Sequence, residues 1–91
     1  MARNGKHRFH RSLDLLGNAV GLAIQLGERA GNTRGRVGVL RHRLERARSE
    51  LDAHRQSKPL DVRHSRQLAE RVLQLTVEYI TEVLAVWTEE N

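Results

Sequence analysis

Histidine and acidic side chains are the residues of this chain that could bind a metal ion or transfer protons. The sequence has five histidines and eleven acids but no cysteine, so any metal site has to use imidazole and carboxylate ligands. Helical proteins that hold two bridged metal ions direct Glu-x-x-His pairs from facing helices into the core. A comparable site therefore requires such pairs on the apolar side of a helix.

The spacing of the histidines does not give this arrangement. His42 and His54 lie twelve positions apart in one segment, and His42 falls opposite the apolar positions of that segment. Asp61 and His64 are three positions apart, but they stand near the start of the last helical segment. We therefore predict surface histidines, with no metal site and no cofactor.

Nucleophilic and phosphate-binding motifs are also missing from the sequence. No serine lies in a nucleophile elbow, no glycine-rich stretch matches a phosphate-binding loop, and no pair of acids occupies apolar positions. The charged residues fall on the outer sides of the expected helices, whereas a small helical enzyme lines a pocket with several of them. The sequence predicts that the protein is not an enzyme.

Arginines dominate the stretch 34–48, which contains six of them and a single glutamate. At 100° per residue they divide into two flanks of one helix. The first flank alternates in sign, so its members are expected to form ion pairs within the helix. That flank consists of Arg41, Glu45, Arg48, Asp52 and Arg55. The second flank sets Arg36, Arg43 and Arg46 against Glu50 alone. Most of the run is predicted to be a solvated, ion-paired surface.

Nucleic-acid binding is the alternative interpretation of these arginines. Phosphate contacts hold a protein on nucleic acid without specifying sequence, and the chain has no zinc-finger, RNP or basic-zipper motif. The hypothesis is therefore a sequence-tolerant binder. The basic side chains assigned to it are Arg3, Lys6, Arg8, Arg11, Arg36, Arg43 and Arg46.

The net charge of +5 is unevenly distributed along the chain. Residues 1–71 hold all 16 lysines and arginines and seven acids, whereas residues 72–91 hold four acids and no base. A chain divided in this way can attract partners of either sign, and it can equally pair with itself.

The apolar pattern predicts three helices. Residues 1–11 have no apolar period and are expected to form a basic, flexible tail, after which Ser12 can cap a helix over about 12–29. A strand remains an alternative there, because Val20, Leu22, Ile24 and Leu26 alternate. Apolar residues at heptad spacing predict a second helix over about 33–57. A third is predicted over about 60–89, following a cap at Ser57 or Asp61.

The second and third helices are predicted to fold back on each other as an antiparallel hairpin. Four facing pairs of apolar residues then share one register. These pairs are Leu40 with Tyr79, Leu44 with Leu75, Ala47 with Val72, and Leu51 with Leu68. The same register places Arg41 beside Glu78. The first helix is expected to cover the second apolar row of the last helix, which completes an all-α, three-helix domain over 12–91.

Surplus apolar surface is expected near Ile80, Leu84 and Trp87, where it predicts a homodimeric bundle and a protein-binding site. Trp87 is the predicted anchor, and the alternative is that it packs on the first helix as an ordinary core residue. The preferred function is a non-enzymatic helical regulator or adaptor that binds another protein, in the cytoplasm and without a membrane span. A further hypothesis is attachment of the amphipathic N-terminal segment to a membrane surface.

Overall fold

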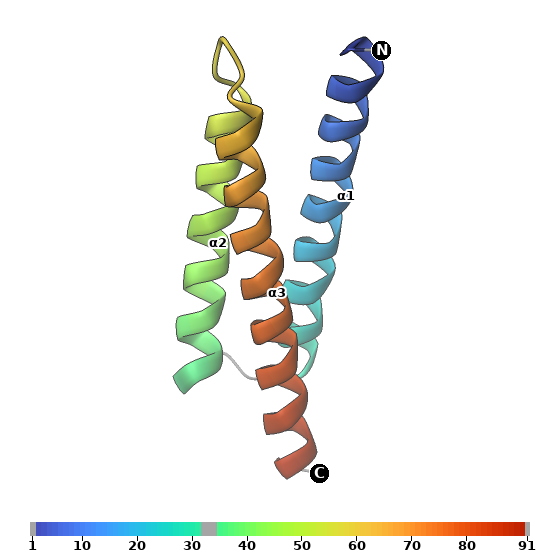
Figure 1. The fold of residues 1–91 in the computed structure, drawn as a ribbon. Coiled ribbons are helices and arrows are strands. Elements are labelled where there is room, and N and C mark those ends of the chain that lie inside the picture. The colour runs from blue at the N-terminus through green and yellow to red at the C-terminus, as the bar shows by residue number, and fades with distance from the viewer. Residues whose placement is uncertain (1, 32–34, 91) are drawn as a thin grey trace.

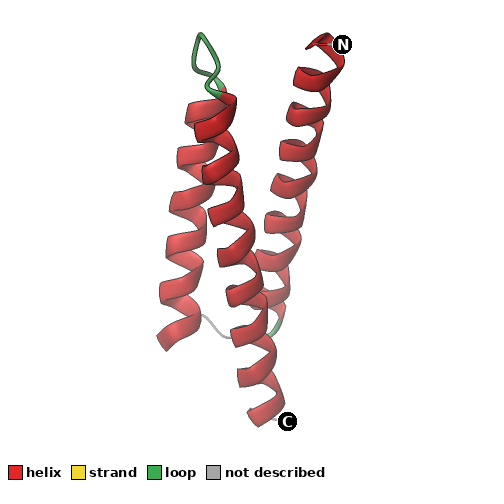
Figure 2. Cartoon of the chain, viewed as in Figure 1, coloured by secondary structure: helices red, strands yellow, loops and turns green. Residues whose placement is uncertain are grey.

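Three helices make up the structure, a computed structural model that describes the backbone of residues 2–31 and 35–90. Side chains are described for residues 8–31 and 35–89. The helices are α1 (Ala2–Arg29), α2 (Gly35–Arg55) and α3 (Val62–Glu90). Within these described residues the remainder is turn or coil and no strand occurs (Figure 2). The predicted all-α, three-helix fold is confirmed, and the strand alternative for the first segment is wrong.

The helices form an elongated up-down-up bundle (Figure 1). The chain's principal extents are 51 × 19 × 15 Å. Helices α1 and α3 run in the same direction and α2 runs against both. Helix α3 is the common element, because α2 packs mainly on α3, α1 also packs on α3, and α1 touches α2 little. Towards its N-terminus α1 diverges from the other two helices (Figure 1).

Helix α1 starts at Ala2 and includes residues 2–11 of the predicted basic tail, so the predicted helix start at Ser12 is wrong. Ser12 does not cap the helix. Its hydroxyl donates to the carbonyl oxygen of Arg8 at 2.9 Å, one turn earlier in the same helix. Phe9 packs against the hydrophobic core, so tertiary contacts support the helix well before Ser12. At the other end Gly31 adopts a φ of 72°, a left-handed conformation that suits glycine and ends the helix.

The α2–α3 hairpin follows the predicted register. All eight residues of the four predicted layers are buried, and Leu44 at the centre has no exposed surface. Asp61 is the residue that caps α3, since its carboxylate accepts a hydrogen bond of 3.1 Å from the backbone NH of His64. The predicted start of the second helix at about residue 33 lies outside the described residues.

The core is aliphatic apart from one tyrosine, and α1 enters it through small residues. Val20 and Ala23 are buried, and Gly27 lies directly against the Tyr79 ring of α3. A methyl group at Gly27 would overlap the Tyr79 hydroxyl, so this glycine allows the two helices to approach closely. Helix α1 is therefore held tightly to α3 near its C-terminal end.

Candidate interaction surfaces

The most distinctive surface of the molecule is apolar and lies on α1 and α3. Seven large hydrophobic side chains are exposed among the described residues, and six of them belong to these two helices. We call these six residues the open face. They are Leu15, Leu22, Leu73, Val77, Leu84 and Trp87, with exposed fractions between 42% and 66%. The seventh, Val39, is on α2.

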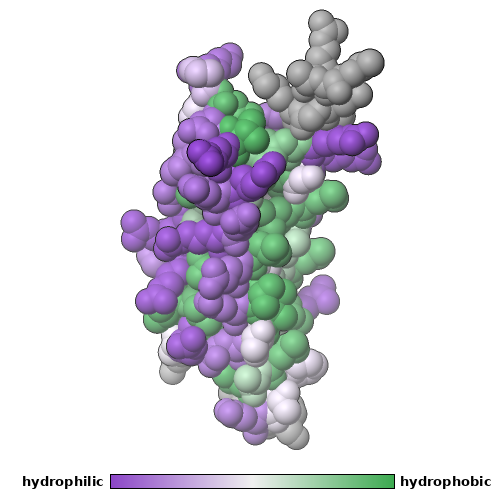
Figure 3. Space-filling model, in the orientation of Figure 1, coloured by the Kyte–Doolittle hydropathy of each residue, from purple (hydrophilic) through white to green (hydrophobic). Residues whose placement is uncertain are grey.

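Both rows of the open face point away from α2. On α1, the residues that reach α2 are Asp14, which pairs with Arg55, and Glu28, which pairs with Arg41. At 100° per residue, Leu15 and Leu22 lie about 80–140° around the helix from these two residues, so they are turned away from α2. On α3, Glu82 pairs with α2, and the apolar row lies roughly on the opposite side of the helix. In Figure 3 hydrophobic atoms accordingly gather over α1 and α3, while the α2 side is hydrophilic.

An apolar groove continues the open face towards the N-terminus of α1, where the two helices diverge. It has a volume of about 250 Å³. Its lining residues are Phe9, Ser12, Leu13, Leu16, Arg66, Ala69, Glu70 and Leu73. The groove lies where α1 diverges from α3 towards its N-terminus, whereas the two helices are in close contact at Gly27.

The sequence located only part of this surface. Leu84 and Trp87 are exposed as predicted, whereas Ile80 is half-buried and packs against the core. Trp87 is therefore not the ordinary core residue of the alternative interpretation. The expectation that the first helix covers the second apolar row of α3 holds only in part: α1 packs on α3 and Ile80 is half-buried, but Leu73 and Leu84 stay about half exposed.

Sequence reasoning did not assign Leu15, Leu22, Leu73 or Val77 to an interaction surface, although their spacing carried a signal. On α3 the row runs at intervals of four and three through Leu73, Val77, Ile80, Leu84 and Trp87. On α1 it runs through Leu15, Ala19, Leu22 and Leu26. Such a heptad pattern is typical of a helix face that packs against another helix.

The first arginine flank of α2 is largely ion-paired, as predicted. Arg41 donates to Glu45 at 3.0 Å, and Arg48 lies 4.0 Å from Asp52. The predicted contact of Arg41 with Glu78 is wrong, because the Arg41 side chain instead reaches Glu28 of α1 at 2.8 Å. The hydrogen bonds with Glu45 and Glu28 raise the pKa of Arg41 above its ordinary value, and partial desolvation opposes them. This cation therefore joins α2 to α1.

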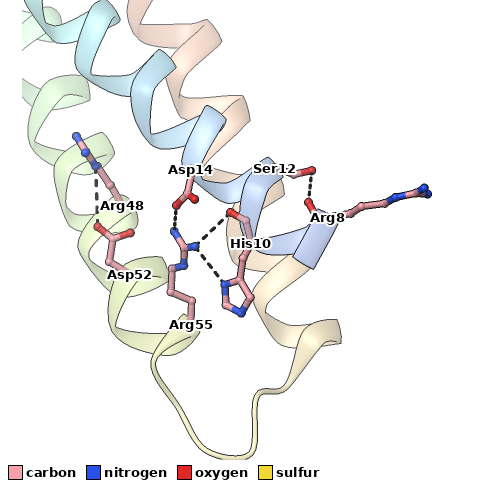
Figure 4. A network of polar contacts seen from close by, with 7 residues as sticks. All are labelled: Arg8, His10, Ser12, Asp14, Arg48, Asp52 and Arg55. Atoms are coloured by element: carbon pink, nitrogen blue, oxygen red, sulfur yellow. Dashed lines mark hydrogen bonds and ion pairs between the residues drawn. The ribbon is translucent and has the colours of Figure 1, made fainter. Parts of the chain in front are cut away.

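Arg55 makes the second connection between α2 and α1, at the opposite end of the bundle (Figure 4). Its guanidinium donates to Asp14 at 2.9 Å and to the backbone carbonyl of His10 at 3.2 Å. The same nitrogen that bonds the carbonyl lies 3.1 Å from Nδ1 of His10. Only 16% of the Arg55 side chain is exposed, so this arginine has a structural role that its position in the paired flank did not indicate.

Arg43, Arg46 and Glu50 of the second arginine flank line a polar hollow between α2 and α3, of about 570 Å³, which we call the arginine groove. Its lining residues are Arg43, Arg46, Ala47, Glu50, Arg71, Gln74, Leu75 and Glu78. Among the described side chains, Arg43, Arg46 and Arg71 form no ion pair. Sequence reasoning missed Arg71, because it is close to the others only across the hairpin.

The remaining predicted nucleic-acid contacts do not join this groove. Arg36 lies 3.5 Å from Glu82, so it is partly neutralised. Arg8 and Arg11 are exposed on α1, a helix that contributes nothing to the groove. The side chains of Arg3 and Lys6 lie outside the described residues. Of the seven predicted residues, the structure brings only Arg43 and Arg46 together at one hollow.

The histidines near the α2–α3 turn are the last polar cluster. The rings of His54 and His64 are 4.4 Å apart and meet edge to face. His42 and His64 are exposed as predicted, but His54 is half-buried. Its Nε2 atom and the buried Ser65 hydroxyl have no hydrogen-bond partner in the structure. Among the described residues, no group of three or more His, Asp or Glu side chains is placed to hold a metal ion.

Comparisons with protein-family models, with curated protein sequences and with solved structures gave no match to this chain. The helices were also compared with the length and hydropathy that a bilayer span requires. Within the described residues, none contains an apolar stretch long enough to cross a membrane. The function therefore has to be inferred from the open face and the arginine groove.

Proposed function

We propose that the protein is a non-enzymatic helical adaptor or regulator that acts by binding another protein through the open face. The observation that carries this proposal is the concentration of exposed apolar side chains on one side of the bundle, from Leu15 on α1 to Leu84 on α3. The largest exposed apolar patches of soluble proteins commonly mark interaction sites. A homodimer, as the sequence predicted, is one form of this binding.

The composition of the open face supports this role. It contains a half-exposed tryptophan among aliphatic residues, and aromatic anchors dominate the energetics of protein interfaces. Charged residues stand at its edges: Arg66 and Glu70 line the apolar groove beside Leu73. An apolar centre with a charged rim is the usual organisation of a protein–protein interface.

The proposal is tested by affinity capture from the native host with matched variants. In Leu73→Glu/Leu84→Glu, two open-face residues become charged while helix propensity is retained. We expect partners enriched by the natural chain to be lost with this variant and retained with Val39→Glu. Val39 is 50% exposed on α2, so it controls for a charge placed on an equally exposed apolar residue elsewhere. Equal capture by all three chains would contradict the proposal.

Nucleic-acid binding through the arginine groove is the second candidate. The observation in its favour is that three guanidinium groups, from Arg43, Arg46 and Arg71, line one hollow without an ion pair among the described side chains. Glu50 and Glu78 in the same lining oppose it. Two carboxylates beside three cations leave little net charge to displace counterions from phosphates.

Fluorescence anisotropy with a labelled duplex and a labelled single strand, across a salt series, tests this second candidate. A nucleic-acid site predicts binding that weakens steeply with salt, and a salt slope that falls by about 1 for each phosphate contact removed. Arg43→Gln/Arg46→Gln should then reduce the slope, whereas Arg63→Gln, an exposed arginine outside the groove, should reduce it less. Absence of binding at low salt would exclude the candidate.

A further inference from the structure

We propose that the open face is covered by a second copy of this chain, packed antiparallel so that α3 lies on α3 and α1 on α1 of the second copy. This inference rests on the proposed function, because it uses the same face and names its partner. The partner is argued from the spacing of the rows, the area they present and the distribution of charge.

The spacing of both rows suits helices of the same kind. Intervals of four and three residues keep a row of side chains facing a neighbouring helix along its whole length. The rows on α1 and α3 both have this spacing, and both run along helices of 28 and 29 residues. A second copy offers two long helices with matching rows, and a two-fold axis brings each helix against its own counterpart.

The area of the open face reaches the lower limit for a stable dimer when all six of its residues are fully covered. Its six residues are each between 42% and 66% exposed. Six large apolar side chains in this state present on the order of 600 Å² per copy, so that two copies bury about 1,200 Å², the lower limit for a stable interface. The apolar groove beside Leu73 adds to this surface and can receive side chains from the second copy.

The distribution of charge selects the antiparallel orientation. Arg8 and Arg66 each stand seven residues before the first leucine of their row, so both occupy the same end of the open face. Beyond Arg71, α3 carries no basic residue. A parallel pair brings the cations of both copies together at one end, and like charges brought together in an interface oppose association. An antiparallel pair places them at opposite ends.

The antiparallel arrangement also matches the row on α3 with itself. When Leu73 faces Leu84 of the second copy, Val77 faces Ile80 of the second copy, and the same pairs recur across the two-fold axis. Large aliphatic side chains then meet at each of these positions. Helix α2, with its arginines, lies on the outer side of each copy, away from the interface.

Sedimentation equilibrium of the full-length chain, across a wide range of protein concentration up to millimolar, tests for the dimer. We expect a dimer whose Kd rises about 100-fold or more in Leu73→Glu/Leu84→Glu, since these residues lie near the centre of the interface. Val39→Glu should leave the Kd within a few-fold of the natural value. Circular dichroism of each variant establishes that the helices are intact. A natural chain that remains monomeric at every concentration overturns the inference.

The salt dependence of the dimer Kd provides a second test, because salt is expected to strengthen the dimer whereas it weakens nucleic-acid binding. Each copy carries a net charge of +5, so the two copies repel each other at low ionic strength. Added salt screens this repulsion, and we expect the Kd of the dimer to fall several-fold between low and moderate salt. A Kd that rises with salt would show that ion pairs, and not the open face, hold the copies together.

The absence of cysteine from the sequence makes the orientation testable by disulfide formation. Leu73→Cys and Leu84→Cys are prepared separately and then mixed under oxidising conditions. The antiparallel arrangement predicts cross-linked dimers in the mixture and few in either variant alone. Cross-linking of each variant alone that equals the mixture overturns the antiparallel arrangement.

Failure of this inference and failure of the proposed function give different results. A monomeric natural chain whose captured partners depend on Leu73 and Leu84 overturns the dimer and leaves protein binding through the open face intact. A monomeric chain whose captured partners are the same in Leu73→Glu/Leu84→Glu overturns both.

Discussion

Helix α3 has two interfaces that differ in how completely they are closed. Against α2, four apolar layers are buried, and Leu44 and Tyr79 have almost no exposed surface. Against α1, the helices approach most closely at Gly27, Val20 and Leu13 are also buried, and an apolar groove lies open beside Leu13 and Leu16. Of the α3 row that begins at Leu73, Ile80 is half-buried, and Leu73, Val77, Leu84 and Trp87 stay exposed.

The difference shows that the two interfaces of α3 contribute to different properties of the protein, one to its stability and the other to its exposed apolar surface. The hairpin of α2 and α3 supplies the sealed part of the core, which is where burial of apolar surface stabilises the fold most. Helix α1 is attached through small residues and through two arginines, Arg41 and Arg55, that reach it from α2. Its remaining apolar row stays at the surface, where it extends the open face. The incomplete interface is therefore the one that is suited to binding.

The largest expected effect on stability comes from replacing one leucine in each interface with alanine. Leu44→Ala should lower the free energy of unfolding by about 2–5 kcal/mol, because it leaves a cavity in a fully buried layer. Leu13→Ala should cost less, because Leu13, although only 4% exposed, borders the apolar groove, and neighbouring side chains can move into the space that it leaves. Urea denaturation at a concentration where the chain is monomeric measures both. Equal losses of unfolding free energy in the two variants would show that the two interfaces are equally closed.

A pair of glycines on α1 tests how closely this helix approaches α3. In Gly27→Ala the new methyl group would overlap the Tyr79 hydroxyl, so we expect a loss of about 1–3 kcal/mol as the helices are forced apart. Gly21→Ala is the matched control, since nothing lies within 4 Å of its added methyl. There the better helix propensity of alanine should stabilise the protein by up to about 1 kcal/mol.

Thermal or urea unfolding of the two variants should therefore give opposite signs. The double variant Gly27→Ala/Tyr79→Phe removes the hydroxyl and should recover part of the loss, although the ring carbon that carried it remains close. If Gly27→Ala stabilised the protein as Gly21→Ala does, the close approach of α1 to α3 would be contradicted.

The sequence was sufficient to predict the closed interface. Its apolar residues repeat at heptad intervals on both helices, and complementary spacing on two segments joined by a short turn determines the register. The start of α3 was predicted to within two candidate caps, Ser57 and Asp61, and Asp61 is the one that binds the NH three positions later.

The incomplete interface was not predictable in the same way. The start of α1 depends on Phe9 packing into the core, and the segment around it shows no apolar period of its own. The partners of Arg55 are 41 and 45 positions away in the sequence, so local charge patterns could not identify them. Helix α1 also has two apolar rows, and which of them faces α3 was decided by Gly27 and Ala23, whose small size the sequence did not relate to Tyr79.

A smaller effect on stability is expected from substitution of Arg55, the arginine that contacts the diverging N-terminal part of α1. Arg55→Gln removes the ion pair with Asp14 and the hydrogen bond to the carbonyl of His10, and should cost about 1 kcal/mol of stability because the arginine is largely buried. Arg48→Gln is the control, since its 4.0 Å contact with Asp52 is exposed and should contribute little. Hydrogen exchange near His10 should also become faster in Arg55→Gln only. Unchanged exchange there would show that α1 is held by its apolar contacts alone.

The smallest effect concerns Tyr79, which lies where both interfaces of α3 meet. Burial raises the pKa of its hydroxyl above the ordinary value, and the nearby Arg41 opposes this shift. Because the folded-state pKa is the higher one, the associated stability is fully present below the unfolded pKa of about 10 and is lost as the pH rises through the folded value. Tyr79 is the only tyrosine, so ultraviolet absorbance of the phenolate follows it alone. The native chain should ionise at higher pH than the urea-unfolded chain, and Arg41→Gln should move the native midpoint further upward. Coincident midpoints would place the hydroxyl in water and would contradict the closure of α1 over α3 at Gly27.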